Sequence, residues 1–172
     1  MTLNARIAQA LAGVGCLAVI TTGCTSTVPG TASPAPTATE ANSDIFAGMN
    51  ACQVLDQLNA GQGYNPGEKK TRRNECNASK PGVAGNSLAL DPVQGLSEFA
   101  QANAGVTDLS INGRPAMQAD IPTGGCAVAV EVAEHARALV LVTLISSPRD
   151  PQACVEAQAL AEKLEPLLPK VQ

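Results

Sequence analysis

The chain has 172 residues, of which 45% are hydrophobic and only 2% are aromatic. Eleven basic and fifteen acidic residues give a formal net charge of −4 at pH 7. This balance argues against nucleic acid as a partner, because nucleic acids reward a basic protein face. The length suits one domain once a targeting segment is removed.

The N-terminal segment has the pattern of an export signal. Arg6 is followed by an apolar run from Ile7 to Ile20, in which Gln9 is the only clearly polar side chain. This run has the length of a signal-peptide core and is too short for a transmembrane helix, which needs about 20 apolar residues. It ends in Thr-Thr-Gly before Cys24, an order that is similar to a bacterial lipoprotein signal. We therefore expect residues 1–23 to be removed and Cys24 to be lipidated.

Two alternatives to lipidation stay open. Thr21 stands where lipoprotein signals usually have Leu, so ordinary secretion with a free Cys24 thiol, or a retained N-terminal anchor, would also fit the segment. Two acyl chains on one cysteine hold a protein stably at a membrane, whereas one holds it only marginally.

The segment after Cys24 is rich in Ser, Thr, Pro and Ala. Such a composition buries too little apolar surface to fold, so residues 24–43 predict a semi-extended tether. The expected folded domain then spans residues 44–172. Removal of Arg6 with the signal leaves ten basic against fifteen acidic residues, a formal charge of −5 for the mature chain.

The first part of the domain predicts a helix and a basic loop. Asn50 can cap a short helix that runs to about Leu58 and is ended by Gly61. The chain has one basic cluster, made of Lys69, Lys70, Arg72 and Arg73. A solvated loop is the ordinary interpretation of such a cluster. Contact with anionic lipid headgroups, worth about 1 kcal/mol per charge near the surface, is the functional alternative.

A second helix is predicted after two weak candidate strands, at 74–79 and 87–90. Asp91 precedes a proline, which is the pattern of a helix N-cap followed by the first helical residue. A helix that begins there places Val93 and Phe99 on one apolar face.

The C-terminal half has the clearest strand patterns. Asn112-Gly113, within segment 106–121, is the dipeptide best suited to a type I′ hairpin turn. Alternation over 126–133 and the aliphatic run 138–145 predict two central, well-covered strands. Asp150 before another proline predicts the cap of a closing helix. The pattern favours an α+β fold, in which helices pack against an antiparallel sheet in a single disulfide-stabilised domain.

Four cysteines remain in the expected domain, and exported domains are where disulfides persist. Four cysteines allow three pairings, of which we favour the sequential one, Cys52 with Cys76 and Cys126 with Cys154. Each bond would close a loop of roughly 25–30 residues, worth on the order of 3.5 kcal/mol on the chain-entropy model. A zinc site is disfavoured because no two cysteines have CxxC spacing and the chain has one histidine.

The order of several motifs resembles a known family. These motifs are Cys24 with its tether, Cys52-Gln53-Val54-Leu55, Cys76, Ile111-Asn112-Gly113-Arg114-Pro115-Ala116, Cys126-Ala127-Val128-Ala129-Val130 and Asp150-Pro151-Gln152-Ala153-Cys154. In this order the chain is similar to the actinobacterial lipoproteins of the mycobacterial LprB and LprC type, which are grouped as a domain of unknown function. The resemblance implies a membrane-attached lipoprotein with paired cysteines, and it implies no catalytic residues.

No catalytic constellation stands out in the sequence. His135, the residue type used most often in acid–base catalysis, falls at a predicted hairpin tip, where a solvated turn residue is the default. The chain contains no GxSxG elbow, no phosphate-binding glycine loop and no HExxH. The carboxylate pairs have the spacing of exposed faces as often as of sites; they are Glu131 with Glu134 and Glu162 with Glu165. We predict no catalytic residue, no cofactor and no metal.

The preferred hypothesis is a membrane-anchored extracytoplasmic lipoprotein that acts as a non-catalytic binding or interaction module of the cell envelope. Its expected partners are the membrane, through lipidated Cys24, and an envelope protein or an apolar ligand. The first alternative is a carrier of a lipid or other apolar ligand, because the small side chains of Ala127 and Ala129 could leave space in the core. The second is a hydrolase that uses carboxylates alone.

Overall fold

The computed structural model describes residues 45–69, 71–122, 124–146 and 150–170. The expected signal peptide, Cys24 and the tether lie outside these residues. The elements in chain order are α1 (Ala51–Leu58), β1 (Glu75–Lys80), β2 (Ala84–Asp91), α2 (Leu96–Ala102), β3 (Thr107–Ile111), β4 (Arg114–Asp120), β5 (Cys126–Ala133), β6 (Ala136–Leu144), α3 (Gln152–Leu164) and the 3-10 turn η1 (Glu165–Leu167). Within the described part of the chain, no helix is long and apolar enough to cross a membrane.

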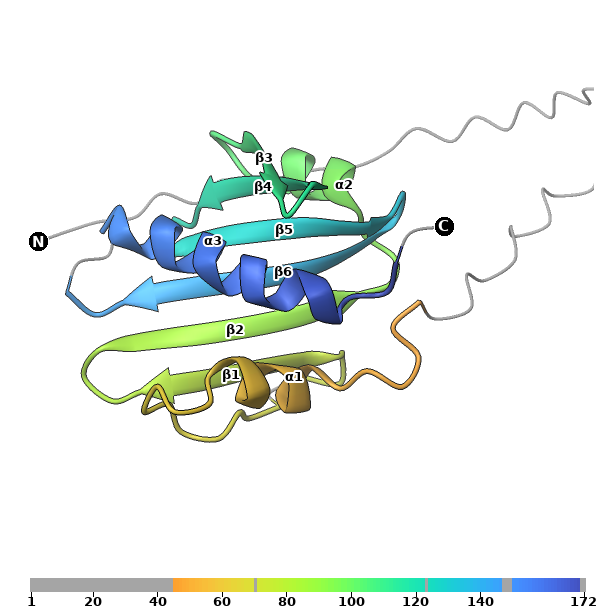
Figure 1. The fold of residues 1–172 in the computed structure, drawn as a ribbon. Helices are drawn as coiled ribbons and strands as arrows, with labels where there is room; N and C mark the ends of the chain where they lie inside the picture. Colours follow the sequence, from red (N-terminus) through yellow and green to blue (C-terminus); the bar gives the residue numbers. More distant parts are fainter. Residues whose placement is uncertain (1–44, 70, 123, 147–149, 171–172) are drawn as a thin grey trace, which may run out of the picture. The chain divides into compact units, whose positions relative to one another are not determined.

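The six strands form one antiparallel sheet in the order β1-β2-β6-β5-β4-β3 (Figure 1). This confirms the predicted α+β fold with an antiparallel sheet. The two strands with the strongest sequence patterns, β5 and β6, lie in the middle. Strand β2 is longer than predicted because it pairs along its whole length with β6, from Ala84 opposite Leu144 to Asp91 opposite Arg137.

The two faces of the sheet are covered by different helices. Val128, Val130 and Val132 of β5 are fully buried in the cluster that includes the apolar residues of α1 and α3. The alternate residues Ala127 and Ala129 lie in a second cluster with Phe99 of α2. Thus α1 and α3 cover one face and α2 the other (Figure 1), and the phenylalanine ring packs beside the small side chains.

Both predicted disulfides are present. Cys52 pairs with Cys76 and joins α1 to β1, and Cys126 pairs with Cys154 and joins β5 to α3. Each bond therefore holds a helix on the sheet face that α1 and α3 share, which compensates for a core with few aromatic side chains.

Three local predictions are confirmed. The Asn50 side chain accepts the backbone N–H groups of Cys52 and Gln53 and caps α1. The β3–β4 hairpin turns at Asn112 and Gly113, whose φ angles of 51° and 88° fit the left-handed region that a type I′ turn requires. The closing helix α3 also forms where expected.

The predicted start of the second helix is wrong. Asp91 is the last residue of β2, and its Oδ1 atom accepts the Val93 N–H at 3.1 Å, which makes a turn after the strand. Helix α2 begins at Leu96, with Gly95 as its N-cap. Val93 is consequently not on the buried face with Phe99: Val93 is 73% exposed, whereas Phe99 is 2% exposed.

Candidate functional site

A cleft of about 490 Å³ lies between the loop that precedes β1 and the loop that joins β2 to α2. Lys69, Arg72 and Arg73 of the predicted basic cluster line one side. Lys70, the fourth member, lies outside the described residues. Residues 89–94 form the opposite wall and supply apolar side chains together with Asp91 and Gln94. The cleft can therefore contact a ligand with both a charged and an apolar part.

The basic wall contains one ion pair. The Arg73 guanidinium lies 3.9 Å from a carboxylate oxygen of Glu75, and the side chain of Arg73 is 75% exposed. The Thr71 hydroxyl donates to Glu75 at 2.9 Å and accepts the Arg73 N–H at 3.1 Å. Within the described part of the chain, Lys69 and Arg72 form no ion pair. These two cations therefore keep their charge available to a ligand.

Asn74 fastens the floor of the cleft to the start of the domain. Its side chain donates to the Met49 carbonyl and accepts the Ala51 N–H, both at 2.9 Å. Its backbone carbonyl accepts the Leu90 N–H, also at 2.9 Å. The cleft is thus held beside Met49, four residues from Ile45, where the described domain begins.

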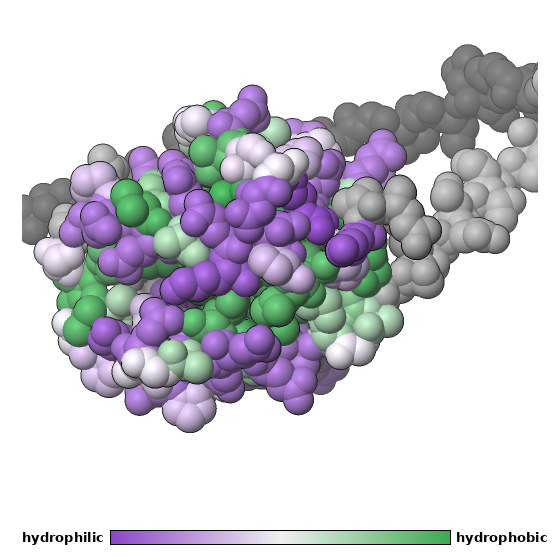
Figure 2. Space-filling view, viewed as in Figure 1, coloured by the Kyte–Doolittle hydropathy of each residue, from purple (hydrophilic) through white to green (hydrophobic). Residues whose placement is uncertain are grey.

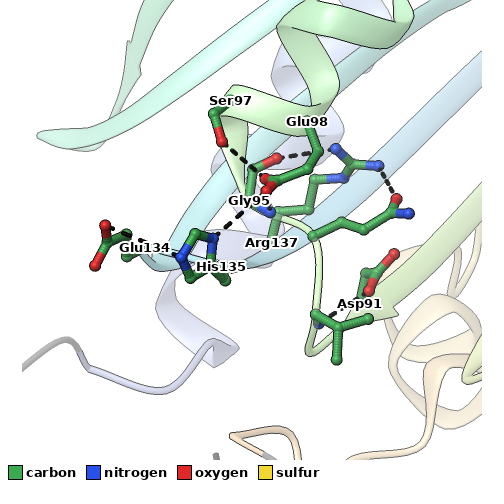
Figure 3. Close-up of polar contacts among 9 residues, drawn as sticks. Asp91, Gly95, Ser97, Glu98, Glu134, His135 and Arg137 are labelled. Atoms are coloured by element: carbon green, nitrogen blue, oxygen red, sulfur yellow. Dashed lines mark hydrogen bonds and ion pairs between the residues drawn. The ribbon is translucent and has the colours of Figure 1, made fainter. Parts of the chain in front are cut away.

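Arg137 holds the opposite wall from behind (Figure 3). Arg137 is 7% exposed, and its guanidinium donates to the Gly95 carbonyl and to Gln94 Oε1, both at 2.9 Å. The guanidinium also lies 5.6 Å from the centroid of the Phe99 ring, within range of a cation–π interaction. Burial lowers the pKa of Arg137, and the negative charges of Asp91 and Glu98 oppose that shift. Its Nε atom is buried without a hydrogen-bond partner.

Glu98 fixes the start of α2. Its carboxylate accepts the Gly95 N–H at 2.7 Å and the Ser97 hydroxyl at 2.9 Å, and it lies 3.4 Å from His135 Nδ1 (Figure 3). The backbone N–H of Glu98 itself, the Ser97 hydroxyl and the Gly95 N–H lower the pKa of Glu98 to about 2, and His135 adds to the shift. This carboxylate is therefore held ionised as a helix cap, which does not suit it to donate a proton near neutral pH.

The turn between β5 and β6 packs against Gly95, the residue that follows the cleft wall. A methyl group at Gly95 would overlap the carbonyl oxygen of Glu134, so only glycine allows this approach. His135 lies in the same turn, as predicted, with a side chain that is 57% exposed. The Ser97 hydroxyl donates to Glu98, so this group does not form a serine–histidine nucleophile pair.

The carboxylate pairs weighed in the sequence do not share one environment. Glu165 is ion-paired with Arg114, with 3.1 Å between its carboxylate oxygen and Arg114 Nε, and both side chains are mostly buried. Glu162 is exposed on α3, and Glu131 of β5 stands opposite Arg137 of β6.

One further group of metal-ligand types occurs among the described residues. Asp120 lies beside Cys126 and Cys154. The two sulfur atoms are bonded to each other and offer no thiolate to an ion.

Sequence reasoning found the basic residues of the cleft but missed Gln94, Gly95 and Arg137. Glu98 accepts the Gly95 N–H as the third helical residue does in a capping box, but Gly95 has no side chain to complete that motif, so the sequence gives only a weak signal for the start of α2. Nothing in the sequence placed Arg137 behind this loop, because that contact depends on how β6 lies against the chain some 40 residues earlier.

The chain matches no curated protein and no solved structure. A family model described as a protein of unknown function, DUF3558, matches residues 19–167. The match covers most of the chain and includes both cleft walls, Arg137 and all four disulfide-bonded cysteines. The chain therefore belongs to the DUF3558 family of proteins of unknown function.

Proposed function

We propose that the protein is an extracytoplasmic lipoprotein, anchored in the cell membrane through Cys24, whose folded domain is a non-catalytic binding module of the envelope. The resemblance to the LprB and LprC type of lipoproteins supports the same assignment. The pair of disulfides carries the proposal, because disulfides persist in oxidising compartments outside the cytoplasm. Each disulfide links a helix to the sheet, so the oxidising conditions met on export would also stabilise the folded domain.

The binding role rests on the cleft. Its apolar and charged walls suit a ligand of mixed character better than a wholly apolar one. The carrier alternative relied on space beside Ala127 and Ala129, but these side chains are buried against Phe99. A carrier role would therefore need the cleft rather than the core. On the face that Figure 2 shows, hydrophilic residues cover α3 and apolar surface shows between α3 and α1.

The non-catalytic role is proposed because the candidate groups serve the fold. Glu98 caps α2, Arg137 holds residues 94 and 95, and Glu165 pairs with Arg114. Turnover of an envelope substrate by the purified protein would contradict this part of the proposal and would revive the hydrolase alternative.

The anchor is tested by fractionating cells that export the wild-type protein or its Cys24→Ala variant. Membranes are washed with high salt, because salt releases proteins held only by charge but not a protein held by two acyl chains. We expect the wild-type protein to stay with the washed membranes and the variant to be released. Retention of the variant after the wash would show that something other than a lipid on Cys24 holds the protein.

A further inference from the structure

We propose that the basic cleft docks on the anionic phospholipid headgroups of the membrane that carries the anchor. The assignment rests on the proposed function, because it uses the anchor to bring the domain to that surface. It takes up the basic cluster, which the general role of a binding module leaves unexplained.

The charge of the cleft differs in sign from that of the chain. Lys69, Arg72 and Arg73 face two carboxylates, Glu75 and Asp91, so the lining has a net charge of +1, whereas the mature chain has −5. Both carboxylates already have partners: Glu75 accepts from Thr71 and pairs with Arg73, and Asp91 accepts the Val93 N–H. The cations are the groups left to meet a ligand, and their complement is an anion.

The cleft wall opposite the three cations, residues 89–94, is already held in place by contacts within the protein. Arg137 binds Gln94 Oε1, so the amide NH₂ of Gln94 is the group left to donate to a phosphate oxygen. The buried guanidinium also holds the Gly95 carbonyl, which keeps the loop in one conformation. A preformed donor costs less entropy on binding than one that must be ordered. Val93, 73% exposed beside these donors, can enter the headgroup layer.

The position of the cleft fits the membrane as the source of the anion. Asn74 ties the cleft floor to Met49, close to the first described residue, Ile45. About 20 residues separate Cys24 from this point, so covalent geometry limits the distance between them to about 70 Å. Charges are screened beyond about 8 Å at physiological salt, so the cations act on the membrane only if the cleft docks. The cleft lies near Ile45, at the end of the domain that follows the expected tether. The domain therefore does not have to turn over for the cleft to reach the membrane.

The test uses the expected mature chain, residues 24–172, with Cys24→Ala, which removes both the apolar signal segment and the lipid and leaves every cleft residue. Flotation measures its partitioning onto vesicles of phosphatidylcholine, with or without about one third phosphatidylglycerol. The cleft variant combines Lys69→Gln, Arg72→Gln and Arg73→Gln. The matched control removes the same number of charges elsewhere, through Lys80→Gln, Lys163→Gln and Lys170→Gln. The single variant Arg72→Gln serves as a minimal change at an exposed side chain.

We expect partitioning onto the anionic vesicles only. Each cation near the surface contributes about fivefold, so Arg72→Gln should weaken partitioning about fivefold and the triple cleft variant on the order of 100-fold, while the control stays close to the parent. The proposal is overturned if the parent does not partition onto the anionic vesicles, or if the cleft and control variants behave alike. Displacement by inorganic phosphate at equal ionic strength would overturn it too, because the cleft would then take a free anion. Failure of the anchor is read separately, from the salt-washed membranes of the wild-type protein.

Discussion

Replacing Phe99 with Ala tests how α2 is held on the sheet. Phe99 is 2% exposed and packs in a cluster whose other buried members are Ala119, Ala127 and Ala129. These small neighbours cannot fill the space that the ring leaves, so we expect a loss of about 3–5 kcal/mol in the free energy of unfolding. The variant also removes the ring that lies 5.6 Å from the Arg137 guanidinium, an interaction worth about 0.5–1 kcal/mol or more.

Val93→Ala is the matched control, because the sequence pattern placed Val93 and Phe99 on the same buried face. In the structure Val93 is 73% exposed, so its truncation should change stability by about 0.5 kcal/mol or less. A domain of this size has a total stability of about 5–15 kcal/mol, so the two variants are easily distinguished.

The assay is urea denaturation of the exported protein with its disulfides intact. Far-ultraviolet circular dichroism is the suitable signal, because the chain has no tryptophan. With a urea dependence of roughly 2 kcal/mol per molar, Phe99→Ala should lower the midpoint by about 2 M. Equal shifts for the two variants would refute the packing described for α2, and a large shift for Val93→Ala alone would restore a helix that starts after Asp91.

Three further predictions concern the cap, the disulfides and the hairpin. The pKa of Glu98 is lowered to about 2, so its contribution to stability is complete above about pH 4.5 and is lost as the pH falls towards 2. Glu98→Gln should therefore lower stability at neutral pH and flatten the acid side of the stability profile. Parallel pH profiles of the wild-type protein and the variant would count against this role of Glu98. Replacing both Cys126 and Cys154 with Ala opens a loop with a sequence separation of 28 and should cost about 3.5 kcal/mol in urea denaturation, whereas an unchanged midpoint would deny the bond a role in stability. Gly113→Ala places a side chain at φ 88° where no neighbouring atom lies close, so only the backbone conformation is strained. We expect the free energy of unfolding to fall by about 1–2 kcal/mol, and an unchanged stability would contradict the type I′ turn.

The parts of the fold that could be predicted are those that local chemistry determines. The side-chain oxygen of Asn50 caps α1 wherever the helix packs, and the backbone preferences of Asn112-Gly113 suit a type I′ turn. In the structure the Asn112 side chain also donates to the Glu162 carbonyl of α3 at 2.9 Å. The alternation in β5 predicted two covered faces, and both are covered. The favoured disulfide pairing joins cysteines that follow one another in the sequence, and the structure contains that pairing.

The start of α2 could not be predicted because one motif has two solutions. An aspartate before proline can cap a helix, but the same side chain can close a turn after a strand, as Asp91 does. The choice depends on the whole-length pairing of β2 with β6, which carries the strand as far as Asp91. Helix α2 then has to start where Gly95 can pass the Glu134 carbonyl.

Only one wall of the candidate site could be predicted from the sequence. The basic residues are neighbours in the sequence, so the cluster could be seen directly. The wall opposite them comes from residues 89–94, and its rigidity comes from Arg137, more than 40 residues further on. Arg137 falls in a predicted hairpin turn, where a cation is ordinarily solvated. In the structure Arg137 is buried, because the turn packs against the loop before α2.

The intact mass of the protein extracted from its native membrane tests the proposed anchor and the disulfide-bonded domain together. We predict the mass of residues 24–172 plus a diacylglycerol thioether and its acyl chains, less four hydrogens for the two disulfides. A chain that still carries residues 1–23, or one without added lipid, would contradict the anchored lipoprotein. A lipidated chain that retains the four hydrogens would instead contradict the disulfide-bonded domain on which the assignment to the envelope depends.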